Sequence, residues 1–282
     1  MVAASKLRYA QDQAHKSDPY AQHLAALLRQ TEAQQALTDL PRSRMLRSAP
    51  PREDGARVLL LVVTSDRGLC GAFNGMMVRE ARRRIAALES SGAHVQLLCL
   101  GRKGRDQLRR VHGAKMLALF DDKIPRRRVE LSFAEGVAAA LRALFEAGEV
   151  DEVHAVFGHF KSAIAQVVTW ERLLPISVPS TPASLPNQEN GDMTDSAAPE
   201  ILSEPNLAIV LDRLAARFLA ARLYGILVDS AVSEQSARTM AMDNATRNAG
   251  EMIDRLTLVY NRSRQAAITR ELVEIISGAE AL

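Results

Sequence analysis

The sequence predicts an α/β domain inserted between two long terminal helices that form an antiparallel coiled coil. Residues 1 to about 40 are rich in Ala, Gln and Leu, with one proline and no glycine, which is a helical composition. Residues 57–178 alternate short aliphatic runs with amphipathic stretches, and no proline follows Pro205. Because these are the only two long helical regions, the simplest arrangement pairs the two ends of the chain, with the α/β part at the base.

The central region has the strand–helix alternation of a largely parallel sheet. The aliphatic run at residues 57–64 has the pattern of a strand buried on both faces. Further strands are expected at residues 95–100, 152–157 and 163–169. Helices are expected at residues 76–89, 105–111 and 133–147.

The C-terminal region, residues 205–282, is expected to form one helix about 110 Å long. Ser203 is expected to cap its start, with Pro205 in the first turn. Positions spaced alternately by four and three residues are largely apolar from Leu207 to Val232, which is a coiled-coil seam. The seam is then small or polar, turns apolar again at residues 253–260, and is lost beyond. We interpret the middle and tip of this helix as shaped for something other than a fixed partner helix.

Composition excludes several classes of protein. The 282 residues are 47% hydrophobic and 24% charged, as in folded proteins rather than disordered ones. A net charge of +3, from 36 basic and 33 acidic residues, argues against a protein that neutralises many phosphates. Two cysteines are too few for a disulfide scaffold or a four-thiolate zinc site.

No targeting or membrane-spanning segment is visible in the sequence. The longest apolar run, residues 58–63, is far shorter than the ~20 residues needed to cross a bilayer. Neither a secretory signal nor a transit peptide is recognised. We therefore expect a reducing compartment, with membrane contact only through a partner.

A glycine-rich turn at residues 68–75 follows the first strand, which is where phosphate-binding loops lie. It lacks the Lys-Ser/Thr of a P-loop and the glycine spacing of a dinucleotide fingerprint, so we interpret it as a structural turn. Cys70 has no histidine near it in sequence, which favours a small buried residue over a nucleophile. The six histidines lack metal-binding spacing. No catalytic residue, cofactor or metal is expected.

Arginine clusters occur at residues 42–47, 82–84, 102–110 and 126–128. Nucleic-acid binding is one interpretation. It is disfavoured because nearby acids weaken the positive field and aromatics that could stack on bases are nearly absent. Solvated helix faces, or contact with protein or anionic headgroups at the base, are favoured instead.

Segments along most of the chain resemble the gamma subunit of the F-type ATP synthase. The most specific is SARTMAMDNATRNAGEMIDRLTLVYNRSRQAAITRELVEIISGAEAL at residues 236–282, followed by TSDRGLCGAFN at 64–74 and MVAASKLRYAQ at 1–11. Weaker support comes from SEPNLAIVLD at 203–212 and from residues 160–176, which end in RLLPI. The resemblance implies a Rossmann-like α/β domain near the membrane end of the coiled coil.

The resemblance also implies a function, that of a central rotating shaft. The upper shaft sits inside a hexamer of alpha and beta subunits, and the lower end binds the epsilon subunit and the membrane c-ring. Ion flow turns the ring and shaft, which drives the catalytic beta subunits through ATP synthesis or hydrolysis. The shaft subunit is not itself catalytic, binds no nucleic acid, and lies peripherally on the cytoplasmic face of the bacterial inner membrane.

By resemblance, nine residues are expected to contact partners. They fall into four groups: polar residues that contact a beta-subunit loop, apolar residues at the tip of the shaft inside the hexamer, residues at the foot of the shaft near the ring, and one basic residue of the lower shaft. In that order, the residues are Arg264 and Gln265; Ile275, Ile276, Ala281 and Leu282; Glu204 and Pro205; and Arg238.

Four regions follow from these expectations. They are an N-terminal coiled-coil helix and linker (1–56), the α/β domain (57–178), a flexible connection (179–204) and the C-terminal helix (205–282).

One departure from the family concerns the N-terminus. Family members usually begin about two dozen residues before the MVAASKL match. An N-terminal helix of about 40 residues spans ~60 Å, so pairing from the base would leave the C-terminal helix bare beyond about residue 243. Either the start codon is assigned too far downstream, which we favour, or the chain is truncated and relies on the hexamer for cover. An intact native mass near 30.8 kDa would contradict the first explanation.

Two alternatives to the shaft remain open at this point. One is a truncated, non-functional gamma-like chain, and the other is a coiled-coil binding protein. A nucleotide-binding enzyme would require a phosphate loop or a paired acid and base, and neither is found in the sequence.

Overall fold

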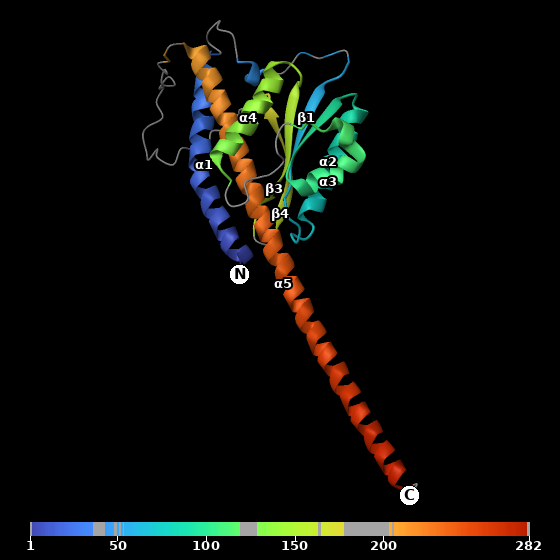
Figure 1. The fold of residues 1–282 in the computed structure, drawn as a ribbon. Coiled ribbons are helices and arrows are strands. Elements are labelled where there is room, and N and C mark those ends of the chain that lie inside the picture. The colour runs from blue at the N-terminus through green and yellow to red at the C-terminus, as the bar shows by residue number, and fades with distance from the viewer. Residues whose placement is uncertain are drawn as a thin grey trace.

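A mixed four-stranded sheet forms the centre of the globular part of the chain, here called the body, which comprises the described residues between 54 and 177 (Figure 1). Its strands β1 (Arg57–Val63), β2 (His94–Leu100), β3 (Glu152–Phe160) and β4 (Gln166–Leu174) have the order β2-β1-β3-β4. β1 pairs in parallel with β2 and β3, and β4 pairs antiparallel with β3. The computed structural model describes residues 2–35, 43–47, 50, 52, 54–118, 129–162, 165–177, 203–204 and 206–280.

β4 is the exception in the expected largely parallel sheet. Only residues 161–165 separate it from β3, and Lys161 N–H donates to Ala165 O there at 3.2 Å. So short a connection can join only antiparallel neighbours, since a parallel crossover needs about a dozen residues or more. The prediction at residues 163–169 also ended too early. Glu171 and Arg172 interrupt the apolar pattern because this edge strand is only partly covered: Glu171 accepts a hydrogen bond from Arg222 of α5, and Arg172 is exposed.

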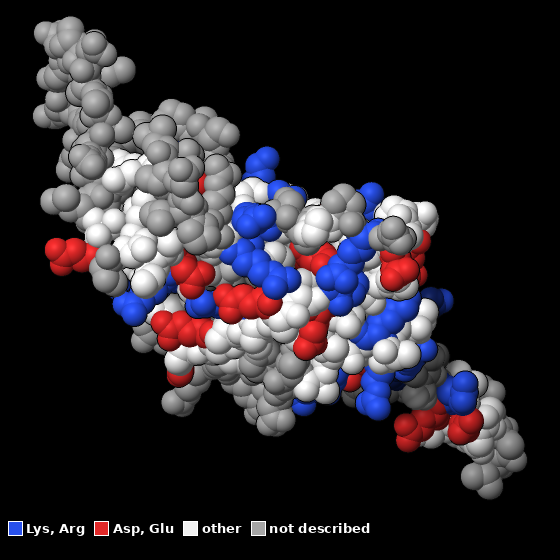
Figure 2. All heavy atoms as spheres, turned by 90° about the horizontal axis from the view of Figure 1, so that it is seen from above, with Lys and Arg blue, Asp and Glu red and all other residues white. Residues whose placement is uncertain are grey.

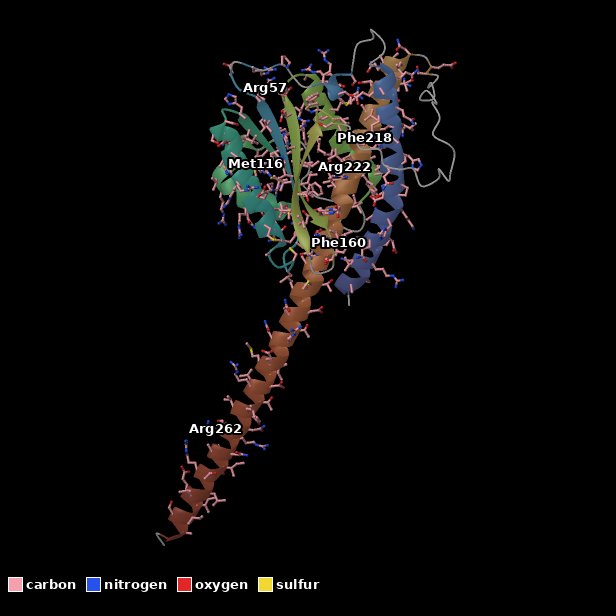
Figure 3. The ribbon with its side chains drawn as sticks, turned by 180° about the vertical axis from the view of Figure 1, so that it is seen from behind. Arg57, Met116, Phe160, Phe218, Arg222 and Arg262 are labelled. Carbon is pink, nitrogen blue, oxygen red and sulfur yellow. The ribbon has the colours of Figure 1, made fainter. Side chains whose placement is uncertain are left out.

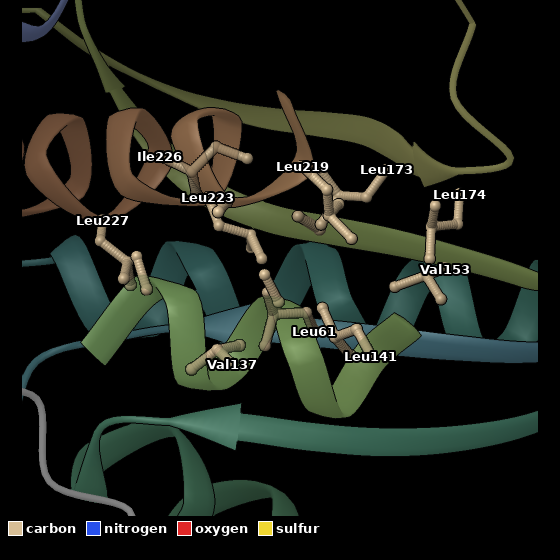
Figure 4. Close-up of a cluster of buried hydrophobic side chains, with 14 of the residues drawn as sticks. Leu61, Val137, Leu141, Val153, Leu173, Leu174, Leu219, Leu223, Ile226 and Leu227 are labelled. Atoms are coloured by element: carbon tan, nitrogen blue, oxygen red, sulfur yellow. The ribbon is translucent and has the colours of Figure 1, made fainter. Parts of the chain in front are cut away.

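β1 divides its side chains between two hydrophobic cores, because successive residues of a strand face opposite sides. Leu59 and Leu61 pack on the side of α4 (Leu131–Glu146) and α5 (Leu207–Glu280), as Figure 4 shows for Leu61. Leu60 and Val62 pack on the side of α2 (Phe73–Ser90) and α3 (Arg102–His112). Each fully buried leucine contributes about 1.5–3 kcal/mol, so β1 holds the two layers together.

The predicted central helices are confirmed as α2, α3 and α4, each beginning two or three residues earlier than expected. α3 begins directly after Gly101, whose φ is 101°. A Cβ at this position would lie 2.1 Å from the carbonyl oxygen of Thr64, so the close approach requires glycine. Two short 3₁₀ helices, η1 (Arg44–Leu46) and η2 (Gly113–Lys115), complete the described elements.

α1 (Val2–Gln35) runs antiparallel beside the first half of α5 (Figure 1). Gln13 donates from Nε2 to the Tyr224 hydroxyl at 2.6 Å, and Ser43 Oγ donates to Asp212 Oδ1 at 2.9 Å. Later positions in the N-terminal region therefore meet earlier positions of α5. The predicted end of the first helix, at residues 36–40, lies outside the described residues.

α5 extends without a break over 74 residues, or about 110 Å. Asn206 caps its start, because its Oδ1 accepts the N–H of Ala208 at 2.9 Å. The prediction that Ser203 is the cap is therefore wrong; asparagine one residue before the first turn satisfies the free amide instead. Pro205 and most of the expected connection at 179–204 lie outside the described residues.

Candidate partner-binding surface

α5 consists of a packed half (residues 207–239) and a free half (residues 240–279). In the packed half Leu211, Leu223 and Ile226 are completely buried. In the free half every large apolar side chain is exposed, from 36% at Met242 to 72% at Leu258. The expectation that the helix is bare beyond about residue 243 is confirmed (Figure 1). Free apolar surface of this extent marks a site of interaction with another protein.

The first part of the free half carries a narrow apolar face, here called the central stripe. Its members are spaced three or four residues apart or adjacent, which places them on one side of a helix. The central stripe consists of Met252, Ile253, Leu256, Val259 and Tyr260, all 60–66% exposed. Glu251 and Asp254 lie on the opposite side, and Arg255 and Arg262 flank the stripe.

A second apolar face, here called the tip stripe, consists of Ile268, Leu272, Ile275 and Ile276, which are 50–67% exposed. Leu272 follows Leu256 by sixteen residues, which at 3.6 residues per turn is a rotation of about 160°. The tip stripe therefore faces nearly opposite to the central stripe. One flat partner on one side of α5 cannot cover both, so the free half fits partners that surround it.

Polar clamps fix the packed half of α5 to the sheet and to α4. Asp229 Oδ1 accepts the N–H of Phe160 at 2.8 Å, at the end of β3. Arg222 donates from Nε to Glu171 of β4 at 2.6 Å. Arg142 of α4 donates to Asp212 at 2.8 Å. Figure 3 shows Arg222 on the packed half of α5, Phe160 at the end of β3, and Arg262 on the free half. A rotation of the body would thus carry α5 with it.

The glycine-rich loop docks on α5 at the boundary between the two halves. Arg238 donates to the carbonyl oxygen of Gly68 at 3.4 Å and forms an ion pair with Glu234 at 2.6 Å. Burial raises the pKa of Glu234, and the neighbouring Arg238 opposes that shift. Neither the docking nor the role of Glu234 was predicted; the Glu-Arg spacing of four residues was the only sequence signal.

Inside this loop a hydrogen-bond network matches the interpretation as a structural turn. Asn74 Oδ1 accepts the N–H of Ser65 at 3.0 Å, and its Nδ2 donates to Ser65 Oγ at 2.7 Å and to Cys70 Sγ at 3.1 Å. Cys70 is 2% exposed, as expected of a small buried residue.

Two further properties of the described residues concern metals and membranes. They contain no group of three His, Cys, Asp or Glu side chains placed to hold a metal ion. None of their helices is both long and apolar enough to cross a membrane.

Comparisons with known proteins agree with this geometry. The family model described as ATP synthase matches residues 1–282. The chain is 43% identical over 282 residues to the ATP synthase gamma chain of Phenylobacterium zucineum, covering 100% of this chain and 91% of the relative. It is 40% identical over 288 residues to that of Rhodospirillum rubrum, of which 92% is covered.

The chain belongs to the ATP synthase gamma chain family.

Solved structures show the same fold at lower identity. The central stalk and c-ring structure of the Tetrahymena thermophila mitochondrial ATP synthase contains a chain that matches with a TM-score of 0.59 and 23% identity. The match covers 87% of this chain and 96% of the other. A chain of the Euglena gracilis mitochondrial enzyme matches with a TM-score of 0.57 and 17% identity, covering 99% and 95%.

The structure places the residues predicted from the gamma-subunit resemblance at three heights along α5. Arg264 and Gln265 are exposed and lie between the central stripe and the tip stripe. Ile275 and Ile276 belong to the tip stripe, while Ala281 and Leu282 lie outside the described residues.

The two remaining predicted contacts lie toward the body. Glu204 is exposed near the start of α5, and Pro205 lies outside the described residues. The Arg238 side chain is only 16% exposed, because it is engaged with Glu234 and the loop. Within this chain it connects the loop to α5, a contact that the sequence did not predict.

Proposed function

We propose that this chain is the central-stalk rotor subunit of an F-type ATP synthase. The observation that carries the proposal is the free half of α5, with apolar stripes on nearly opposite sides and a packed half clamped to a globular body. Such a helix fits a shaft that is enclosed at its tip and driven at its base. Membership of the gamma chain family over the full chain supports the same conclusion.

The proposal includes a finer description of the architecture. α1 and the packed half of α5 are the antiparallel coiled coil, and the sheet with α2, α3 and α4 is the Rossmann-like domain. The regions 1–56, 57–178, 179–204 and 205–282 are the corresponding parts of the chain. Parallel pairing of β1, β2 and β3 supports this division.

Partner contacts follow the length of α5. The tip residues Ile275, Ile276, Ala281 and Leu282 lie in an apolar sleeve of the alpha and beta subunits, and Arg264 and Gln265 catch a beta-subunit loop. At the other end, the foot with Glu204 and Pro205 meets the c-ring and the epsilon subunit. Figure 2 views the body from that end and shows Lys and Arg interspersed with Asp and Glu. Arg238 is the basic partner-contacting residue of the lower shaft.

The distribution of polar and apolar contacts suits transmission of torque. The clamps at Asp229, Arg222 and Arg142 bind α5 to the body, so a turn of the ring reaches the shaft. At the tip, apolar contact is non-directional. A buried ion pair would instead hold the shaft at one rotational angle, because separating the two charges of such a pair costs ~3–5 kcal/mol. The tip can therefore turn in its sleeve.

On this proposal the chain is a non-catalytic subunit of a proton-transporting two-sector ATPase. ATP chemistry takes place on the beta subunits, and the chain itself holds no cofactor. It lies peripherally at the cytoplasmic face of the bacterial inner membrane, with membrane contact only through the complex. The alternatives of a non-functional gamma-like chain or a separate coiled-coil binding protein gain no support from the comparisons.

The test is single-molecule rotation of the assembled complex with Ile276→Asp. A carboxylate in the apolar sleeve should slow or stall turning, because the charge must be desolvated at every angle. Ser277→Asp, the exposed adjacent position outside the tip stripe, is the matched control and should turn faster than Ile276→Asp. Unchanged rotation of Ile276→Asp at unchanged assembly would contradict the apolar sleeve. Absence of the chain from the purified ATPase complex would contradict the rotor itself.

A further inference from the structure

Two arginine clusters that are separate in the sequence meet on the outer side of the sheet. α2 and α3 pack against each other, and Arg82 of α2 donates to the carbonyl oxygen of Gln107 in α3 at 3.1 Å. Together the two helices carry nine Arg or Lys residues and three Asp or Glu residues. The whole chain has 36 and 33, so its positive excess is concentrated on this pair of helices, here called the α2–α3 face.

The few acidic side chains of this face are already paired. Glu80 accepts hydrogen bonds from Arg83 and Arg84, each at 2.8 Å from Nε. The two arginines, Arg83 most, lower the pKa of Glu80 to about 2. Glu89 forms an ion pair with Lys115, and Asp106 with Arg105 at 3.7 Å. Little negative charge is left to neutralise the other cations.

Five exposed cations of the face have no carboxylate partner among the described residues. Arg82 also donates to the Gln107 carbonyl oxygen, and the charged groups of the other four are available to a partner. An arginine can bind a carboxylate through two parallel hydrogen bonds. These residues are Arg79, Arg82, Lys103, Arg109 and Arg110.

The α2–α3 face does not overlap the surfaces of α1 and α5 that are assigned to the shaft. α2 and α3 cover one side of the sheet, whereas α4, α5 and α1 lie on the other (Figure 1). A partner on this side would not compete with the packing of α1 on α5.

We propose that the α2–α3 face binds an acidic polypeptide segment of another subunit, an inference that rests on the proposed function. Nucleic acid fits less well, because bases stack on exposed aromatic rings. Phe73, the one aromatic residue of these helices, is buried, and Trp170 is stacked on His154 and covered by Arg84. A membrane surface also fits less well, since interfacial helices pair basic residues with large apolar ones. On these helices Val111 is the one exposed large apolar side chain.

The inference is tested by photo-crosslinking in the assembled complex. A benzophenone amino acid replaces Gln107, whose side chain is exposed beside these cations, and the crosslinked peptide is identified by mass spectrometry. We expect a segment of another subunit in which Asp and Glu outnumber Lys and Arg. The yield should fall as NaCl rises from 0.1 to 1 M, since the screening length shortens from ~10 to ~3 Å.

Charge variants test whether the crosslinking yield depends on the cations of the α2–α3 face. Arg79→Glu/Lys103→Glu should reduce the yield about tenfold or more, since each exposed ion pair contributes roughly two- to fivefold and reversal adds repulsion. Arg109→Gln/Arg110→Gln, which introduces no repulsion, should reduce it several-fold. The control Arg8→Glu/Lys16→Glu changes the same number of exposed charges on α1 and should leave the yield unchanged.

The outcomes separate this inference from the rotor proposal. If the chain co-purifies with the ATPase complex but gives no adduct, or one to a segment that is not acidic, the α2–α3 inference is overturned and the rotor stands. An adduct to lipid or nucleic acid also overturns it. If the chain does not assemble with the complex, the rotor proposal itself fails.

Discussion

The packed half and the free half of α5 belong to one unbroken helix and carry apolar residues at similar spacing. Leu223 in the packed half is completely buried, whereas Leu256 in the free half is 60% exposed. The packed half is covered by α1, α4 and the sheet, and no described element reaches the free half. Helical periodicity thus marks surfaces that prefer burial, but it does not say whether the cover comes from the same chain or from a partner.

The two halves also differ in how polar groups are used. In the packed half Asp229, Arg222 and Asp212 hold the helix at defined positions. In the free half, side-chain hydrogen bonds of the threonines return to the helix itself, as from Thr257 to the carbonyl oxygen of Ile253 at 2.8 Å. One half is fixed by directional contacts, and the other presents apolar surface that has none.

The largest expected difference between the halves is in core packing. Leu223→Ala should lower the free energy of unfolding of the isolated chain by about 2–5 kcal/mol, because it opens a cavity. Leu256→Ala, the same change in the free half, should alter it by less than about 0.5 kcal/mol. Urea denaturation followed by circular dichroism measures both. Similar losses at the two sites would show that the free half is covered within the isolated chain.

A smaller difference is expected for the polar clamps. Asp229→Ala leaves the partly buried N–H of Phe160 without its acceptor and should lower the free energy of unfolding by about 1–3 kcal/mol. Asp254→Ala, an exposed position of the free half, should change it by less than about 0.5 kcal/mol. The same denaturation experiment compares the two variants, and equal effects would show that Asp229 does not fix α5 to the sheet.

The smallest effect concerns pH at the boundary between the halves. Burial raises the pKa of Glu234 above its ordinary 4.5, so the folded state binds this proton more tightly than the unfolded state. The contribution to stability is fully present below pH 4.5 and is lost as pH rises through the raised folded-state pKa. Glu234→Gln should flatten this dependence by less than about 1 kcal/mol.

Stability measured from pH 4 upward checks the sign of this effect. Glu251→Gln, at an exposed position of the free half, serves as the control and should leave the pH profile as it is in the natural chain. If Glu234→Gln steepens the fall in stability with rising pH, the sign assigned to Glu234 is wrong.

Much of the fold could be predicted because its signals are local. The aliphatic run of β1 and the amphipathic spacing of α2, α3 and α4 each lie within a few turns of chain. β4 was placed less well, since Glu171 and Arg172 belong to an edge strand whose exposure depends on its neighbour. The docking of Arg238 on Gly68 joins residues 170 positions apart, and no pattern in either segment predicts it.

The sequence by itself predicted one long helix over residues 205–282, described in the structure as α5 (Leu207–Glu280), and which of its side chains prefer burial. Backbone hydrogen bonds between nearby residues and the absence of proline are sufficient for that. Only the tertiary structure decided where along α5 burial stops, that β4 runs antiparallel, and that two distant arginine clusters form one face. These depend on which remote segments meet, because burial and electrostatic fields are set by neighbours in space and not by neighbours in the chain.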